Sequence, residues 1–203
     1  MPKLGILSRK VERRMKKISI ILGALMVCTS GLMALPMGSM MSGQTNFNNG
    51  SLIGSVEYAV YAPGQYSGTT LFPSTDYVYA YRVFDDAASK VGIDFFSVGL
   101  VANAIVGNLT YEASAGDIIP GLQAILSESL INLFMGSAGP ITSGKQSAIL
   151  LFSSPMQPTM GSGAVSGGFT GGEIISLAAP IPEPATLTLL TLGGMFAVRS
   201  RRS

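Results

Sequence analysis

The chain contains 203 residues, of which 47% are hydrophobic and only 12% are charged. A chain of this length accommodates one domain of ordinary size with processing segments at its ends, and two full domains would be crowded. Its 25 glycines and 11 prolines weaken the interiors of helices, so they favour short strands joined by turns. We therefore expect an all-β fold.

The net charge changes sign along the chain. Seven basic residues and one acidic residue precede residue 18, and the last five residues include three arginines. Between residues 41 and 180, nine acidic residues are accompanied by three basic ones, so this body has a net charge of −6. An acidic body argues against electrostatic binding of nucleic acid.

The sequence contains no histidine, and its single cysteine is Cys28. The usual general base, the Ser-His-Asp arrangement and most zinc or copper ligand sets are therefore missing. We expect no catalytic residues, no metal site and no cofactor.

Residues 1–40 are predicted to be a signal peptide and leader. An apolar run at residues 18–34 follows the basic cluster and is interrupted by small residues, which is typical of a cleavable secretory segment rather than a stable membrane span. We expect a signal-peptide helix here, with cleavage near Ala34. Met1 and Met15 both remain as translation starts.

Residues 41–180 are predicted to form a single β-sandwich of short antiparallel strands. Residues 41–53 are polar and rich in glycine, so we expect a flexible leader there and structure from about Ser55. Alternating or β-branched and aromatic runs, bounded by turn signals, predict six strands at residues 55–61, 77–84, 93–101, 109–113, 147–153 and 174–178.

Two segments of the body are less regular. Residues 122–135 fit a helical period tolerably, but their serines and the turn that follows suit a strand, so we expect a short helical turn and then a strand from Leu130. Residues 161–172 are rich in glycine and predict a flexible connection or loop.

Tyrosines alternate along the second predicted strand, at Tyr77, Tyr79 and Tyr81. One face of that strand is therefore a tyrosine ladder. Such a ladder can stack on sugar rings, but packing between two sheets is its commoner use.

Several acidic residues could in principle carry chemistry. Glu57 and Glu112 would form a glycosidase pair only if the fold placed them within ~10 Å across a cleft. Asp85, Asp86 and Asp94 could bind Ca²⁺ through carboxylate oxygens, but no looped ligand pattern accompanies them, so a solvated acidic turn is favoured.

The sequence of residues 139–145 resembles the start of a phosphate-binding loop. Gln146 occupies the place of the magnesium-binding serine or threonine, and a strand is predicted next where that loop needs a helix. We expect a hairpin turn.

Residues 181–203 combine three elements. A proline-containing motif comes first, and its prolines keep the backbone extended and accessible to a processing enzyme; it consists of Pro182, Glu183, Pro184, Ala185 and Thr186. An apolar stretch follows, which as a 14-residue helix from 185 to 198 would span about 21 Å of a ~30 Å hydrocarbon core. A basic cluster ends the chain and holds it on the cytoplasmic side as a membrane stop, through Arg199, Arg201 and Arg202. We expect a transmembrane-like helix that anchors weakly or transiently.

The motif, the apolar stretch with its Gly-Gly pair and the terminal arginines together resemble the PEP-CTERM sorting signal, which exosortases of Gram-negative bacteria recognise. The resemblance covers residues 181–203 and implies export and processing. More loosely, the body resembles the sandwich domain of planctomycete-type PEP-CTERM proteins, which implies a fold and an exported setting without an activity.

We therefore expect a protein exported through the inner membrane to the cell surface or extracellular matrix. Its partners would be an exosortase-type enzyme, the inner membrane during transit, and exopolysaccharide, with no nucleic acid. A structural, adhesive or glycan-associated role without catalysis is the leading interpretation. The alternative is a secreted carbohydrate-active enzyme that uses carboxylates alone.

Overall fold

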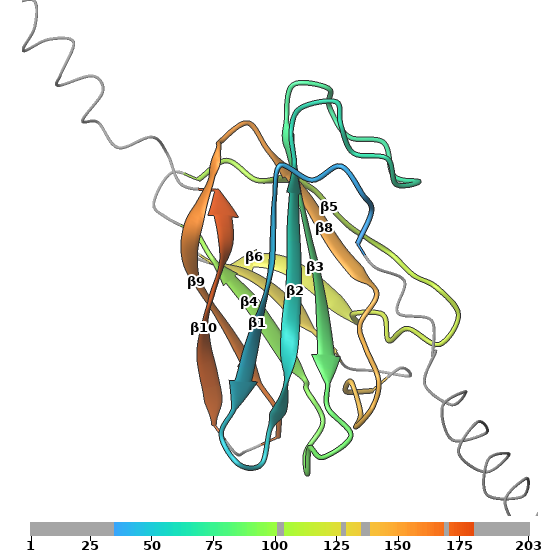
Figure 1. Ribbon diagram of the computed structural model, residues 1–203, viewed down its shortest axis with the longest axis vertical. Helices are drawn as coiled ribbons and strands as arrows, with labels where there is room; N and C mark the ends of the chain where they lie inside the picture. The colour runs from blue at the N-terminus through green and yellow to red at the C-terminus, as the bar shows by residue number, and fades with distance from the viewer. Residues whose placement is uncertain (1–34, 101–103, 127–128, 135–138, 169–170, 181–203) are drawn as a thin grey trace, which may run out of the picture. The chain divides into compact units, whose positions relative to one another are not determined.

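The computed structural model describes residues 35–100, 104–126, 129–134, 139–168 and 171–180. Within these residues the fold is all-β and consists of two five-stranded antiparallel sheets that face each other (Figure 1). In spatial order, the first sheet contains β1 (Met41–Asn48), β2 (Ile53–Tyr61), β3 (Tyr77–Asp85), β8 (Ile149–Ser154) and β5 (Gly107–Glu112). The second sheet contains β10 (Gly172–Pro180), β9 (Pro158–Ser166), β4 (Phe95–Gly99), β7 (Ser129–Leu133) and β6 (Leu122–Leu126). The predicted β-sandwich is confirmed.

The helices expected at the two ends of the chain lie outside the described residues. In the described part of the chain, no helix is long and apolar enough to cross a membrane.

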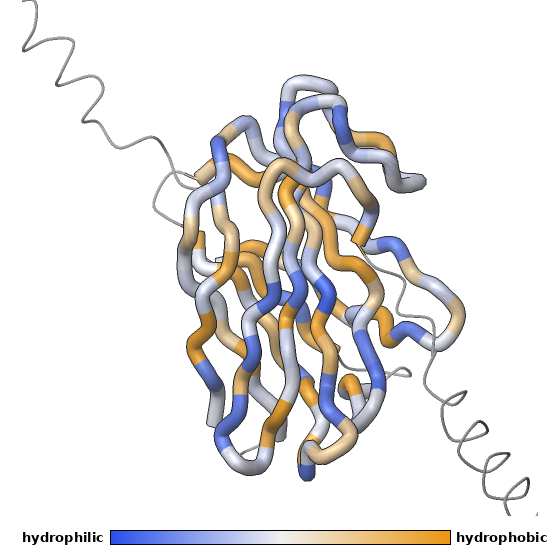
Figure 2. The backbone as a smooth tube through the Cα atoms, in the orientation of Figure 1, coloured by the Kyte–Doolittle hydropathy of each residue, from blue (hydrophilic) through white to orange (hydrophobic). Residues whose placement is uncertain are grey.

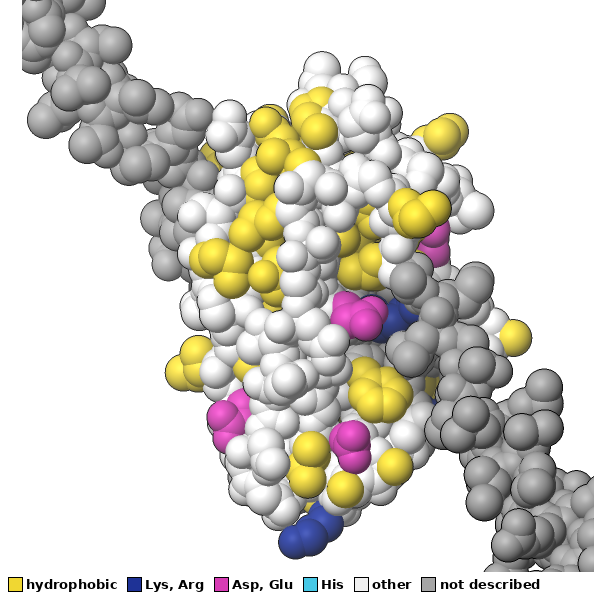
Figure 3. All heavy atoms as spheres, viewed as in Figure 1, with side chains coloured by type: hydrophobic (Ala, Val, Ile, Leu, Met, Phe, Trp, Pro, Cys, Tyr) yellow, Lys and Arg dark blue, Asp and Glu magenta, His cyan; other side chains and the backbone are white. Residues whose placement is uncertain are grey.

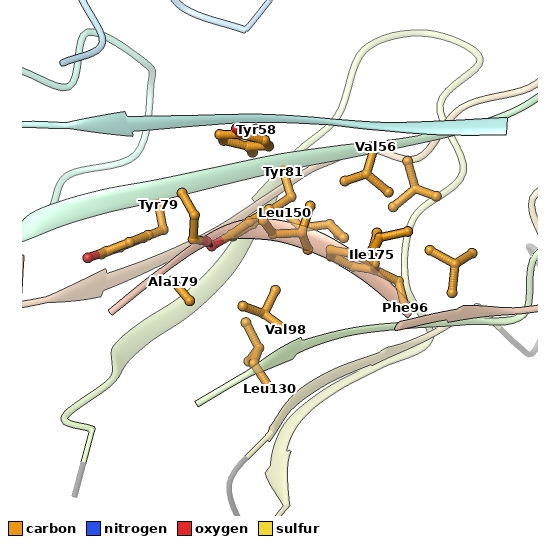
Figure 4. Close-up of a cluster of buried hydrophobic side chains, with 14 of the residues drawn as sticks. Val56, Tyr58, Tyr79, Tyr81, Phe96, Val98, Leu130, Leu150, Ile175 and Ala179 are labelled. Atoms are coloured by element: carbon orange, nitrogen blue, oxygen red, sulfur yellow. Dashed lines mark hydrogen bonds between the residues drawn. The ribbon is translucent and has the colours of Figure 1, made fainter. Parts of the chain in front are cut away.

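The space between the two sheets is filled by side chains that alternate along the strands, in keeping with the two-residue period of a pleated sheet. Figure 2 shows hydrophobic and hydrophilic residues following one another along the strands. Aromatic rings occupy its centre. The Tyr79 ring stacks on Phe152 with centroids 4.8 Å apart and planes 7° apart, and Tyr81 lies 5.9 Å from the same Phe152 ring. Figure 4 shows Tyr79 and Tyr81 among the buried side chains of both sheets. The packing role of the tyrosine ladder is confirmed.

A second, smaller apolar cluster covers the outer face of the first sheet. Tyr61 is fully buried there, because the loop between β2 and β3 folds back over the sheet. Tyr66 of this loop meets Tyr61 edge to face with centroids 5.0 Å apart and meets Phe72 at 5.5 Å. Each contact has the T-shaped geometry that aromatic pairs favour.

The prediction of a flexible leader at residues 41–53 was wrong. Residues 41–48 form β1, which pairs with β2 over its whole length, and Phe47 lies in the core. A Cβ on Gly54 would collide with the Phe84 carbonyl oxygen and would lie 2.6 Å from the Phe47 ring. The glycine serves close packing, and the polar residues of β1 belong to an edge strand that faces solvent.

Two further predictions were also wrong. The expected helical turn before Leu130 is the strand β6, which pairs with β7 from Leu122 to Leu126, so strand pairing overrides a helical apolar spacing. The expected loop at residues 161–172 is largely ordered strand, since β9 continues to Ser166. Gly163 within β9 gives room to its neighbour, because a Cβ there would lie 2.7 Å from the Ser97 carbonyl oxygen of β4.

The aromatic centre of the core predicts a large effect of Phe152→Ala. The change removes the ring on which both Tyr79 and Tyr81 stack, and we expect a loss of about 3–5 kcal/mol in the free energy of unfolding. Urea denaturation followed by circular dichroism measures it. Ile174→Ala, at a position that is 82% exposed, serves as control and should change stability by less than about 0.5 kcal/mol. Equal effects of both variants would contradict the assignment of the core.

Candidate functional site

The last described strand, β10, leads directly to the C-terminal tail. It pairs with β9 from Gly172 to its final residue, where Pro180 lies opposite Pro158. Ala178 and Ala179 just before it are fully buried. The ordered sandwich therefore continues up to two residues before Pro182, the first residue of the predicted processing motif.

Tyrosine hydroxyls from the first sheet hold this region of the second sheet. Tyr81 donates a hydrogen bond of 2.5 Å to the Ala178 carbonyl oxygen of β10, and Tyr79 donates one of 2.8 Å to the Met156 carbonyl oxygen before β9. Burial, with a smaller contribution from Tyr79, raises the pKa of Tyr81 well above its usual value of 10.0. The Tyr81 hydroxyl therefore remains protonated and keeps its role as donor.

The predicted sorting and processing residues lie outside the described residues. These are Ala34, Pro182, Glu183, Pro184, Ala185, Thr186, Arg199, Arg201 and Arg202. Their roles stay predictions, and the structure contributes the position of the strand from which the tail departs.

The two glutamates considered for glycosidase chemistry are far apart. Glu57 lies on β2 opposite Arg82 of β3, and Glu112 lies on β5 opposite Ile149 of β8. Because β3 and β8 separate their strands, the two side chains are three strand spacings apart, roughly 14 Å. Carboxylate pairs of glycosidases are about 5–10 Å apart, so these two do not have the required spacing.

Glu112 instead anchors the loop that covers the first sheet. Its Oε1 accepts a hydrogen bond of 2.6 Å from the Thr70 backbone N–H. Burial by itself would raise the pKa of Glu112, but hydrogen bonds from Thr70, Thr69 and Tyr66 outweigh it and lower the pKa below its usual value. The glutamate is therefore held as a carboxylate that orders the loop.

The acidic residues considered for Ca²⁺ binding have separate structural roles. Asp86 Oδ1 accepts a hydrogen bond from the Ala88 N–H at 2.8 Å, and Asp94 Oδ2 accepts one from the Gly168 N–H at 3.0 Å. Among the described residues, no group of three or more potential ligands could hold a metal ion. Asp86 and Asp94 thus accept hydrogen bonds from nearby backbone groups, whereas the expected solvated turn does not hold for Asp85, which is buried.

Asp85 is the most unusual of these residues because its side chain is fully buried. Neither of its carboxylate oxygens accepts a hydrogen bond with good geometry. Burial raises the pKa of Asp85 to about 6, although the nearby Ser89 hydroxyl lowers it somewhat and Asp86 raises it further. The sequence gives no sign of this burial. Asp85 is the last residue of β3, and no local pattern distinguishes a buried acidic residue from an exposed one at a strand end.

Residues 139–145 form a turn before β8. The Lys145 N–H donates to the Thr142 carbonyl oxygen at 2.9 Å, and the Gly144 N–H donates to the Asp85 carbonyl oxygen at 2.9 Å. A strand and not a helix follows. The turn connects β7 of the second sheet with β8 of the first, so it is a turn between the sheets and not the predicted hairpin.

A buried charged pair on the first sheet escaped sequence analysis. Arg82 Nη2 lies 3.8 Å from Asp117 Oδ2, and both side chains are almost fully buried. Gln146 Nε2 donates to the other Asp117 oxygen at 2.9 Å. The face of the molecule seen in Figure 3 carries only a few scattered acidic and basic side chains. The pair fastens the segment before β6 to the first sheet.

Comparison with known proteins identifies the tail. Residues 180–202 match the PEP-CTERM protein-sorting motif, so the chain carries a PEP-CTERM sorting signal whose first matched residue is the last residue of β10. No curated protein matches the chain, and no solved structure matches it. The resemblance of the body to planctomycete-type sandwich domains stays a prediction.

Tyr81→Phe tests whether the Tyr81 hydroxyl stabilises β10, the strand that leads to the tail. The variant keeps the ring and removes the hydroxyl that reaches Ala178, which leaves a buried carbonyl group without this partner. We expect a loss of about 1–3 kcal/mol in the free energy of unfolding and faster hydrogen exchange in β10. Tyr111→Phe, on a side chain that is 40% exposed, is the matched control. Unchanged exchange in β10 would contradict the proposed role of the hydroxyl.

Asp85→Asn tests the buried carboxyl group. Because the pKa in the folded state is about 6 and the ordinary value is 3.8, the folded protein binds this proton more tightly than the unfolded chain. The ionised group therefore destabilises the fold above pH 6, and the loss is relieved as the pH falls towards 4. We expect the variant to melt at a higher temperature than the unmodified protein at pH 7.5, with the difference vanishing near pH 4. Glu173→Gln serves as control, and an equal pH profile for both variants would contradict the prediction.

Proposed function

We propose that the protein is an exported structural or adhesive component of the cell surface or exopolysaccharide. Its PEP-CTERM sorting signal at residues 180–202 carries this proposal, because that signal supports export and processing by an exosortase-type enzyme. The sandwich acts as the delivered domain and works by binding rather than by turnover.

The position of the signal relative to the fold supports this division of roles. All described strands precede residue 181, and the matched signal starts at Pro180. Cleavage between Pro182 and Ala185 would therefore remove no strand from the sandwich. The backbone pairing of β10 with β9 and the hydrogen bond from Tyr81 to Ala178 keep the new C-terminus attached to the fold.

The tail suits a temporary membrane contact. Its apolar stretch is shorter than the ~30 Å hydrocarbon core when helical, and Arg199, Arg201 and Arg202 resist crossing the bilayer. The chain would be held at the inner membrane during export, after cleavage of the signal peptide near Ala34. An exosortase-type enzyme would then release it by cutting the proline-containing motif.

Binding without catalysis is favoured by the side chains of the body. The chain contains no histidine, and Glu57 and Glu112 are separated by two intervening strands. Of the other described acidic residues, Asp86 and Asp94 accept hydrogen bonds from nearby backbone groups, and the side chains of Asp85 and Asp117 are buried. None of these arrangements favours a carbohydrate-active enzyme, so glycan association is proposed as recognition only.

Mass spectrometry of the protein recovered from an exosortase-containing host tests the sorting step. We expect a C-terminus between Pro182 and Ala185, and we expect Glu183→Ala to leave more of the chain unprocessed. Glu173→Ala, a glutamate substitution on β10 that precedes the signal, is the matched control. An intact C-terminus at Ser203 in the unmodified protein would contradict the proposal.

A glycan array probed with the processed protein tests the binding role. Retention of a glycan without release of sugar supports adhesion, and failure to bind any glycan supports a purely structural role. Released sugar would overturn the proposal that the protein does not catalyse a reaction.

A further inference from the structure

The edge strands of the sandwich differ in their protection against pairing with another chain. The edges β1 and β10 are joined on one side, where the Thr45 hydroxyl donates to the Ser176 carbonyl oxygen at 2.6 Å. On the other side, β5 has an irregular register between Gly107 and Thr110, and Asn108 has a φ of 50°. Irregularities of this kind blunt an edge strand.

The remaining edge, β6, has no register irregularity in the described part of the chain, although the Gln123 side chain joins it to β5. Its sequence LQAIL contains no charged residue and no proline, and it pairs with β7 in an unbroken register. Leu122, Ile125 and Leu126 are 46%, 45% and 56% exposed. An edge strand directs a row of N–H and C=O groups outward, so an uncharged, apolar edge is a template for another strand.

Neighbouring side chains enlarge this apolar edge. Gln123 Nε2 of β6 donates to the Thr110 carbonyl oxygen of β5 at 3.3 Å, which places Tyr111 on the same side of the sandwich. Tyr111 is 40% exposed and Ile119, which precedes β6, is 39% exposed. The exposed apolar side chains of the edge therefore come from both sheets.

We propose that β6 is a self-association site, at which it pairs antiparallel with β6 of a second copy of this chain about a two-fold axis through Ala124. The five-residue strand is complementary to itself in this register. Leu122 lies opposite Leu126 of the second copy on the face that Ala124 shares, and Gln123 lies opposite Ile125 on the other face. The two second sheets then become one continuous sheet, and each copy contributes the same surface, as a two-fold contact requires.

Charge favours this edge over β5 and β10. Two bodies with a net charge of −6 each repel one another, and contacts that oppose acidic residues add to the repulsion. β6 opposes none, whereas β5 carries Glu112 and β10 carries Glu173. β1 is also uncharged, but it is joined to β10 through Thr45. Of the other three edges, β6 therefore offers the approach with the least repulsion.

The size of the edge sets the strength of the contact. Five partly exposed apolar side chains bury roughly 400 Å² on each copy, or about 800 Å² in total, which is below the ~1,200 Å² of stable complexes. The dimer is therefore weak and reversible, and it forms where the local concentration of the protein is high. The inference does not depend on the proposed function.

Cysteine cross-linking tests the pairing and its register. The full chain carries Cys28→Ser, so that each introduced thiol is the only one, and a mild oxidant is added before non-reducing electrophoresis. In the proposed dimer the two Ala124 Cβ atoms lie about 4.5–5.5 Å apart, near disulfide distance. Two Leu122 side chains lie four residues out of register, roughly 13 Å apart.

We expect Ala124→Cys to form a disulfide-linked dimer roughly tenfold faster than Leu122→Cys alone. Mixing Leu122→Cys with Leu126→Cys should restore the cross-link. Ile174→Cys, at an exposed position on β10, measures random collision. Equal cross-linking of all variants, or none above the Ile174→Cys level, would overturn the proposal.

A charge placed on the edge gives an independent measurement. Leu126→Lys puts a cation on each copy opposite the apolar Leu122, and sedimentation at high protein concentration should then show only monomer. Ile174→Lys should leave the dimer unchanged. Because both positions are exposed, unchanged urea denaturation shows that each variant is folded, and persistence of the dimer in folded Leu126→Lys also overturns the proposal.

Discussion

The hydroxyl groups of the buried tyrosines are the constraint on which the sandwich depends. Tyr79 and Tyr81 of β3 point into an apolar interior, where an unpaired hydroxyl would be destabilising. Both find backbone carbonyl groups in the segments around β9 and β10, at Met156 and Ala178. These bonds fix how the second sheet lies across the first, which stacking of the rings alone would leave less specific. The bond from Tyr81 also holds β10, the strand that leads to the sorting signal.

The close approach of neighbouring strands is a second constraint on the sandwich. Glycine makes this approach possible because it has no Cβ atom. Gly54 lets β2 pass the Phe47 ring of β1, and Gly163 lets β9 pass the Ser97 carbonyl group of β4. Both glycines lie in segments whose composition resembles that of a flexible linker. Composition therefore does not distinguish a glycine that frees the chain from one that allows two backbones to pack together.

This ambiguity explains which parts of the fold were predictable from the sequence. Strands rich in tyrosine, valine and leucine, such as β2, β3 and β8, were located correctly because burial on one or both faces leaves a clear pattern. The edge strands β1 and β6 and the glycine-rich β9 were missed, since their identity comes from the partner strand. The sorting signal was recognisable because its order of motif, apolar stretch and arginines is local. The burial of Asp85 and the Arg82 and Asp117 pair depend on distant segments and had no local signature.

The arrangement of the second sheet connects sorting with self-association. Its strand order is β10-β9-β4-β7-β6, so the strand that leads to the tail and the apolar strand lie at opposite edges. Four strand spacings, about 19 Å, separate them. A chain held through its tail at β10 would therefore leave β6 unobstructed by its own attachment point. Confinement at a surface raises local concentration, which is the condition that a weak contact of this size requires.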